Sequence, residues 1–245
     1  MKKIFFLLFS FLSQSILVAQ NLEGIVKYTR ETSWVKIQAQ LPYLSKEEKD
    51  RAKLTWGDNT WKENYLFTFN KEASIYEPNP EQESDEEWSS RLPVLSLYRN
   101  YAQGTKLDVE EMLGKVYVVE DSLVAPNWKI QNKIKEVAGH LCMLAIMEDT
   151  VKKQKIEAWF AQDLPINGGP EHYTGLPGLI LEVNINDGCV VITADKITLQ
   201  TLEKGIKPPK KKGKRIKNTE YTSLIDKHIK DSMKSYRNPF WSMRY

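Results

Sequence analysis

The chain is organised around the stretch Gly175-Leu176-Pro177-Gly178-Leu179-Ile180, which opens an apolar run that continues to Leu181. A second Gly-Pro cluster, PINGGP at 165–170, precedes it, and only the short segment EHYT separates the two. Glycine permits positive φ and close backbone approach, whereas proline fixes φ and removes a donor. These residues therefore predict a shaped loop that feeds a buried strand.

Short apolar and β-branched segments flank this loop on both sides. The strands expected in the second half are 128–137, 141–148, 154–161, 179–184 and 189–194, with 196–202 as an extension. Apart from the Gly-Pro segment the links are short, and Asp187-Gly188 favours a tight turn. Because short links make neighbouring strands antiparallel, we expect a meander.

The first half carries weaker strand patterns and one helix signal. Strands are expected at 22–30, 61–69, 73–76 and 114–120, and residues 32–40 are expected to continue the first extended region. Ser45 and Glu48 have the spacing of a capping box, which predicts a short helix that ends near Leu54.

Helical spacing of apolar residues near the end of the chain, from Tyr221 to Tyr236, predicts an amphipathic helix over 219–236. The fold is therefore expected to be mainly β (α+β). It would comprise an antiparallel meander or half-barrel sheet, the short helix of the N-terminal half and this C-terminal helix.

Residues 1–19 have the pattern of a secretory signal peptide: a basic head, a short apolar core interrupted by serines, and Ala19 before a polar sequence. A membrane anchor would need about 20 consecutive apolar residues, more than this segment offers. No cysteine near the cut supports a lipoprotein anchor. We expect a periplasmic or secreted protein that does not span the membrane, with one β-rich domain over 20–245.

Charge is balanced overall but uneven along the chain. The formal charge of +3 falls to +1 when Lys2 and Lys3 leave with the signal segment, so no nucleic-acid partner is expected. The segment 77–90 is acidic and the segment Lys204–Lys217 is basic. Both are expected to be solvated loops; the alternatives are mutual pairing, or contact of the basic loop with an anionic envelope surface.

The chain has two cysteines, Cys142 and Cys189. Export invites a disulfide, but the expected meander places the two residues three strands apart and at opposite ends of the sheet. That separation exceeds the roughly 7 Å that a disulfide allows between Cα atoms. We therefore expect two free, largely buried thiols.

Two small constellations have the residue types for chemistry. His140 and Cys142 share one strand face and could hold copper or zinc, although two ligands are too few and a buried cysteine beside a hairpin histidine is commoner. Glu171 and His172 could act as an acid–base pair, or simply form a polar loop tip. No nucleophile elbow, HExxH, P-loop or dinucleotide motif accompanies them, so we expect neither catalytic residues nor a cofactor.

Seven tryptophans and eleven tyrosines are many for this length. Most should be core residues, since aromatic side chains bury large areas, while some could line a concave apolar pocket. The candidate binding residues are Trp128, Trp159, His172, Tyr173, Gly175, Leu176, Pro177 and Gly178.

The central stretch and its surroundings resemble the GLPGLI family, secreted proteins of certain Gram-negative bacteria. The resembling elements are Asn127-Trp128, Gly139-His140-Leu141-Cys142, Ala158-Trp159, Pro165–Pro170 and Gly175–Ile180. Their order and spacing match the family pattern over 127–195, although His140 stands where an aromatic residue such as tyrosine is commoner. The meander also looks like the LolA-type periplasmic lipoprotein carriers, a likeness of fold alone.

The resemblance, the export signal and the aromatic content lead to one functional prediction. We expect a non-enzymatic exported protein that binds an apolar ligand or an envelope protein on a curved sheet. The alternatives are a metal-handling protein that uses His140 and Cys142, and an envelope hydrolase that uses Glu171 and His172. The GLPGLI stretch itself is predicted to be a structural device that shapes the backbone.

Overall fold

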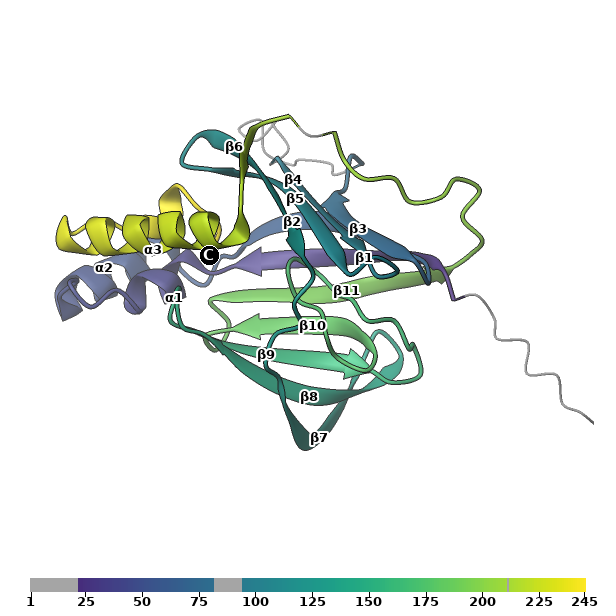
Figure 1. Cartoon of the computed structure of the whole chain (residues 1–245). Coiled ribbons are helices and arrows are strands. Elements are labelled where there is room, and N and C mark those ends of the chain that lie inside the picture. Colours follow the sequence, from purple (N-terminus) through teal and green to yellow (C-terminus); the bar gives the residue numbers. More distant parts are fainter. Residues whose placement is uncertain (1–21, 82–93, 211) are drawn as a thin grey trace, which may run out of the picture.

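A computed structural model of the protein describes residues 22–81, 94–210 and 212–245. The expected signal peptide and residues 82–90 of the acidic segment lie outside these ranges. Within them the chain forms a twelve-stranded mixed sheet that does not close on itself (Figure 1). The strand order is β12-β6-β5-β4-β3-β2-β1-β11-β10-β9-β8-β7.

The strands of the first half are β1 (Gly24–Thr32), β2 (Trp61–Phe69), β3 (Ala73–Pro78), β4 (Leu95–Asn100), β5 (Thr105–Met112) and β6 (Lys115–Ser122). Those of the second half are β7 (Lys129–Val137), β8 (His140–Asp149), β9 (Gln154–Ala161), β10 (Leu179–Ile185), β11 (Val190–Leu199) and β12 (Lys214–Ile216). The helices are α1 (Trp34–Ala39), α2 (Lys46–Trp56), α3 (Asn218–Lys234) and the short 3-10 helix η1 (Pro239–Trp241).

The central strand β1 joins two antiparallel meanders. It pairs with β2 on one side and with β11 on the other, so the two halves of the chain share one sheet. The expected meander of the second half is confirmed, since β7 to β11 follow one another as antiparallel neighbours. Tight turns such as Asn186–Gly188, where all three residues have positive φ, make this order possible.

The helix expectations are partly confirmed. Ser45 caps α2 by accepting from the backbone N–H of Glu48 at 3.2 Å, and the Glu48 carboxylate accepts from the Ser45 N–H at 2.8 Å. The amphipathic helix is present but lies over Asn218–Lys234, slightly earlier than predicted. The extended reading of residues 32–40 is wrong, because Ser33 turns the chain by capping α1.

The two charged segments are more ordered than predicted. Glu77 and Pro78 belong to β3, and the Glu77 carboxylate accepts a hydrogen bond from Ser96 at 2.7 Å. Within the basic segment, Lys214–Ile216 forms β12 and pairs in parallel with β6. The solvated-loop prediction is therefore wrong at one end of each segment.

Both cysteines are free and buried, as predicted. Cys142 on β8 lies opposite Ala161 on β9, which in turn lies opposite Leu179 at the start of β10. Cys189 precedes β11 at the other end of β10, where Ile185 pairs with the first residue of β11. The antiparallel register therefore keeps the two thiols at opposite ends of the sheet.

The segment 162–178, here called the Gly-Pro loop, connects β9 to β10 and crosses the inner face of the sheet. A Cβ on Gly168 would lie 2.7 Å from the ring of Phe67 and 2.6 Å from the hydroxyl of Tyr101, so the loop backbone touches the strands of the first half. Leu164, Ile166 and Leu176 bury their side chains beneath it. The concave face is thus largely filled by the loop.

The C-terminal tail, 238–245, docks against the sheet as expected from its aromatic content. Phe240, Met243 and Tyr245 are buried, and the Tyr245 hydroxyl accepts a hydrogen bond from Asn186 at 2.7 Å. The tail lies close to α3, and in Figure 1 α2 is seen at the same end of the molecule. Among the described residues, no helix has the length and apolar character needed to cross a membrane.

Gly178 should be indispensable for stability. A Cβ at this position would collide with the carbonyl group of Ala161, a backbone atom that cannot move without breaking the β9–β10 pairing. We expect Gly178→Val to lower the free energy of unfolding by about 2 kcal/mol or more in urea titrations. The control Gly205→Val, at an exposed glycine with open space around it, should change stability by less than about 0.5 kcal/mol. Equal stability of the two variants would contradict the structural role of Gly178.

Candidate functional site

The Gly-Pro loop delivers two consecutive charged residues, Glu171 and His172, to two different groups of side chains. Glu171 has positive φ and a buried side chain, whereas the side chain of His172 is partly exposed. The described contacts contain no hydrogen bond or ion pair between the two side chains.

Glu171 is held by two arginines that come from distant parts of the chain. Its Oε1 accepts from Nε of Arg30 on β1 at 3.0 Å and from Nε of Arg244 in the tail at 2.8 Å. Arg30 also pairs with Glu63 on β2 at 3.1 Å. Burial raises the pKa of Glu171, but the two guanidinium groups outweigh burial and bring the pKa to about 2. Glu171 is therefore a fixed anion and a poor proton acceptor.

His172 faces two carboxylates of β5. Its Nδ1 lies 3.7 Å from Oδ2 of Asp108, and its Nε2 lies 3.6 Å from Oε2 of Glu110. Asp108 is fully buried and also pairs with Arg99 on β4 and, at 3.0 Å, with Lys106. Burial lowers the pKa of His172, but Glu110 and Asp108 raise it, and the net pKa is above its usual value. The arrangement therefore favours an imidazolium held between two anions.

Asp108, Glu110 and His172 place one potential ligand atom each within 4.8 Å of one another, close enough for a metal ion. However, Arg99 and Lys106 already contact Asp108, so a cation at this point would meet two positive side chains. The charges of this group fit a hydrogen-bonded cluster better than a metal centre.

The metal pair predicted from the sequence, His140 and Cys142, has other partners. His140 Nδ1 lies 2.6 Å from the Asp163 carboxylate, and the buried Cys142 thiol donates to the His140 carbonyl at 3.5 Å. Burial raises the pKa of Cys142 to about 11, which disfavours the thiolate that binds metals. Among the described residues, His140 and Cys142 belong to no group of three potential ligand atoms that all lie within 4.8 Å of one another.

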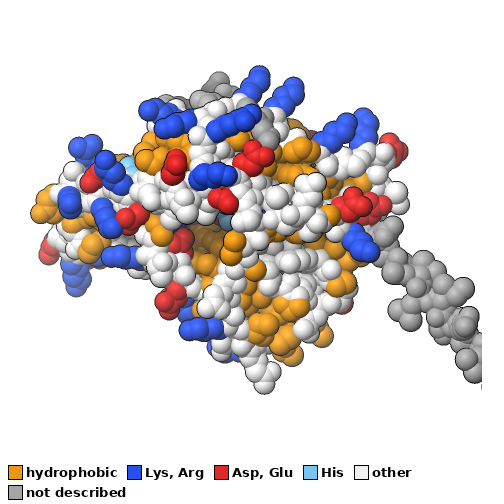
Figure 2. All heavy atoms as spheres, in the orientation of Figure 1, with side chains coloured by type: hydrophobic (Ala, Val, Ile, Leu, Met, Phe, Trp, Pro, Cys, Tyr) orange, Lys and Arg blue, Asp and Glu red, His pale blue; other side chains and the backbone are white. Residues whose placement is uncertain are grey.

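A cavity of about 240 Å³, here called the methionine cavity, lies between the Gly-Pro loop, β5, α3 and the tail. Its apolar wall consists of Met112, Pro126, Met147, Ile225 and Met243. Its polar lining includes Lys106, Glu110, Asp149, Lys152, Gln154, Glu171, His172, Tyr221, Thr222 and Arg244. Figure 2 shows the surface hollowed beneath the start of α3, with hydrophobic side chains inside the hollow.

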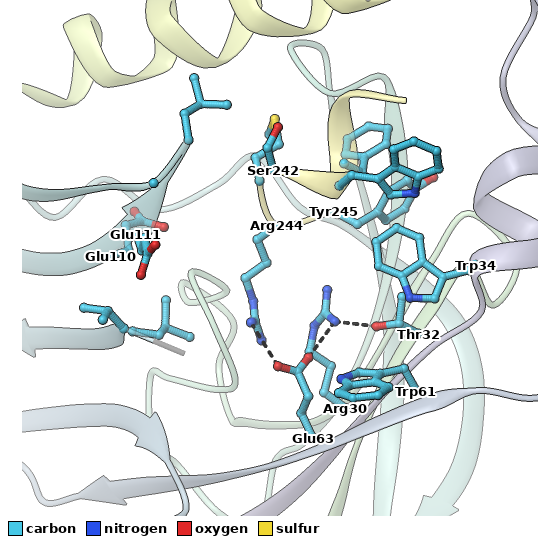
Figure 3. A pocket seen from close by; sticks show the side chains of 17 residues that line it. Arg30, Thr32, Trp34, Trp61, Glu63, Glu110, Glu111, Ser242, Arg244 and Tyr245 are labelled. Atoms are coloured by element: carbon cyan, nitrogen blue, oxygen red, sulfur yellow. Dashed lines mark hydrogen bonds and ion pairs between the residues drawn. The ribbon is translucent and has the colours of Figure 1, made fainter. Parts of the chain in front are cut away.

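A larger and more open cavity of about 560 Å³, here called the tryptophan cavity, adjoins the first (Figure 3). Trp34 and Trp61 lie on one side, and Glu110 and Glu111 lie across from them. Trp241 also lines this cavity. Arg244 lines both cavities, so it forms part of the wall between them.

Among the residues expected to bind a ligand, His172 and Tyr173 line the methionine cavity. Trp128 supports the loop, because its Nε1 donates to the Thr174 carbonyl at 2.8 Å. Trp159 lies on the opposite face of β9 from the buried core residues, with the Lys135 ammonium 4.6 Å from its ring.

The GLPGLI residues shape the backbone beside the cavity. Gly175 has a φ of +93° and packs against Ala125, Leu176 is buried, Pro177 is exposed, and Gly178 touches Ala161. None of the four lines the methionine cavity.

Sequence reasoning missed most of the residues that build the cavity. Lys152 and Gln154 sit at a turn with no recognisable motif, and Arg244 reaches the site from the far end of the chain. One signal was available: Asp108 and Glu110 alternate with apolar residues in LDVEEM, which places two carboxylates on one face of a strand.

Comparison with known proteins supports the fold and the central motif. Residues 129–182 match the model of a family described as a protein of unknown function (Porph_ging), which is the GLPGLI family. The matched segment runs from β7 into β10 and contains the whole Gly-Pro loop. A search of curated proteins finds no match.

Two crystal structures of PNGF-II, in different space groups, resemble the fold. Each has a TM-score of 0.52, with 15% and 13% sequence identity and coverage of 83% and 82% of this chain. The chain spans only about a third of the PNGF-II chains, 33% and 32% of their lengths. At this identity the likeness concerns the fold alone, and it gives no support to the expected LolA-type half-barrel.

The ion pairs of Glu171 with Arg30 and Arg244, here called the Glu171 clamp, predict a specific pH dependence. Because the folded-state pKa is depressed to about 2 from an ordinary value of 4.5, the clamp stabilises the protein at neutral pH, and this stabilisation is lost as pH falls from about 4.5 to 2. Glu171→Gln should therefore cost on the order of 3 kcal/mol at pH 7. The difference from the unmodified protein should shrink below pH 4.5 in denaturant titrations.

The control for this prediction is Glu72→Gln, which removes an exposed carboxylate in the β2–β3 turn. Its free energy of unfolding should stay within about 0.5 kcal/mol of the unmodified protein. A stability loss in Glu171→Gln that is independent of pH would show that packing, and not charge, holds the loop.

Proposed function

We propose that this chain is a non-enzymatic, exported protein of the GLPGLI type that binds a small ligand with an apolar body in the methionine cavity. The observation that carries the proposal is a cavity with one apolar wall and a few polar groups converging on it, the usual composition of a small-molecule site. Six separate parts of the chain contribute to it, so folding is required before the site exists.

The cavity wall suits an adaptable apolar contact. Met112, Met147 and Met243 are unbranched and can adjust their rotamers to ligands of different shape. The volume of about 240 Å³ lies below the ~300–1,000 Å³ typical of drug-sized ligands. The ligand is therefore small, or only one end of a longer molecule enters.

The charged groups support binding over acid–base catalysis. The hydrolase alternative needs Glu171 and His172 to exchange a proton, whereas Glu171 is fixed as an anion by two arginines. Asp108 is likewise held ionised, because Arg99 offsets the effect of burial and keeps its pKa low. Groups locked in this way position other side chains but do not cycle between protonation states near neutral pH.

The proposal that the protein is exported, to the periplasm or beyond, rests on the signal-peptide pattern of residues 1–19. It agrees with the two cysteines being free and buried, because folding then needs no particular redox compartment.

A pair of neighbouring substitutions on α3 tests the binding site. Thr222 lines the methionine cavity, whereas Ser223 is exposed and points elsewhere. Thr222→Trp should fill the cavity and weaken binding of the neutral fluorescent probe N-phenyl-1-naphthylamine at least tenfold, and Ser223→Trp should bind like the unmodified protein. Melting temperatures of both variants check that the fold is retained. If Thr222→Trp binds the probe normally, the ligand site lies elsewhere.

A further inference from the structure

Lys152 stands out among the residues of the methionine cavity because its charge has no counter-ion. Its side chain is mostly buried, and its Nζ donates to the backbone carbonyl of Arg244 at 3.0 Å. Within the described parts of the chain, no carboxylate lies within ion-pair distance of it. A buried ammonium with a single neutral acceptor still has two N–H groups to satisfy.

Two further donors on residues of the cavity lining lack well-formed hydrogen bonds. Gln154 is 3% exposed, and its Nε2 lies beside the Tyr245 hydroxyl without an ideal hydrogen bond. The Nη2 of Arg244 is also buried and without a described partner. Both atoms lie below the surface, which leaves Lys152, partly exposed and lining the cavity, as the donor for a bound molecule.

The carboxylates nearby do not serve as the acceptor for Lys152. Glu171 is occupied by Arg30 and Arg244. Asp149 accepts the backbone N–H groups of Val151 and Lys152 at 2.8 and 2.9 Å. Glu110 lies against His172, with 3.6 Å between Oε2 of Glu110 and Nε2 of His172. The acceptor must therefore come from outside the chain.

We propose that the ligand of the methionine cavity is a small amphiphilic carboxylate, whose head group pairs with the Lys152 ammonium and whose hydrocarbon part lies against the methionines. This inference rests on the function proposed above and adds the chemical class of the ligand. Pairing with the carboxylate supplies Lys152 with the counter-ion that the protein lacks, and charge-assisted hydrogen bonds of this kind are stronger than neutral ones.

The test compares two probes that differ only in the head group, octanoate and 1-octanol. Calorimetric titration of the unmodified protein should give a dissociation constant at least about tenfold lower for octanoate, because a charge-assisted hydrogen bond replaces a neutral one. Lys152→Met keeps a long side chain and removes the charge, so it should bring the dissociation constant of octanoate to that of 1-octanol. The control Lys153→Met removes the same charge from the next residue, which is exposed and outside the cavity, and should keep the preference.

The outcomes separate the two proposals. If both probes bind the unmodified protein equally, the assignment of a carboxylate head group is wrong while the apolar site stands. If Lys152→Met keeps the octanoate preference, the assignment of the head group to Lys152 is wrong. If neither probe binds, the proposed function fails together with the ligand class. Because the first comparison uses the unmodified protein, it remains decisive even if Lys152→Met is poorly folded.

Discussion

The ion pairs of Glu171 with Arg30 and Arg244 connect the three parts of the chain on which the site depends. Arg30 lies on β1, the strand that joins both meanders, Glu171 lies on the Gly-Pro loop, and Arg244 lies in the tail. All of these charges are largely removed from water, where an unpaired member would be strongly destabilising. The three segments must therefore dock together, and the order of the C-terminal tail depends on an anion delivered by the loop.

This constraint changes what the curved sheet can do. An empty concave face would offer an open groove, but the Gly-Pro loop lies across it and leaves smaller, partly enclosed cavities. Gly168 and Gly178 make this path possible because any side chain there would strike Phe67 or the backbone at Ala161. Arg244 then lies between the methionine and tryptophan cavities, so a single clamp both closes the concave face and divides it.

Local patterns in the sequence were sufficient for most of the framework. The strand meander, the Ser45 capping box and the separation of Cys142 from Cys189 all follow from periodicity, turn residues and short links. Segments whose structure depends on distant partners were misread: β12 forms only because β6 offers an edge. The cavity was missed for the same reason. Lys152 becomes a cavity residue only because it lies near Met112 and α3 in the folded chain, and no local pattern reveals that proximity.

The distinctive GLPGLI stretch and the ligand-facing groups thus have different roles. Residues 175–178 set the backbone path, while Lys152, which carries the ammonium proposed to bind the ligand, lies upstream in the β8–β9 turn. Both sets fall inside the segment that matches the family model, whereas most of the apolar wall, with Met112, α3 and the tail, lies outside it. A protein that shared only the matched segment would keep Lys152 and lose most of that wall. The proposed ligand would therefore contact separate parts of this chain with its head group and with its hydrocarbon part.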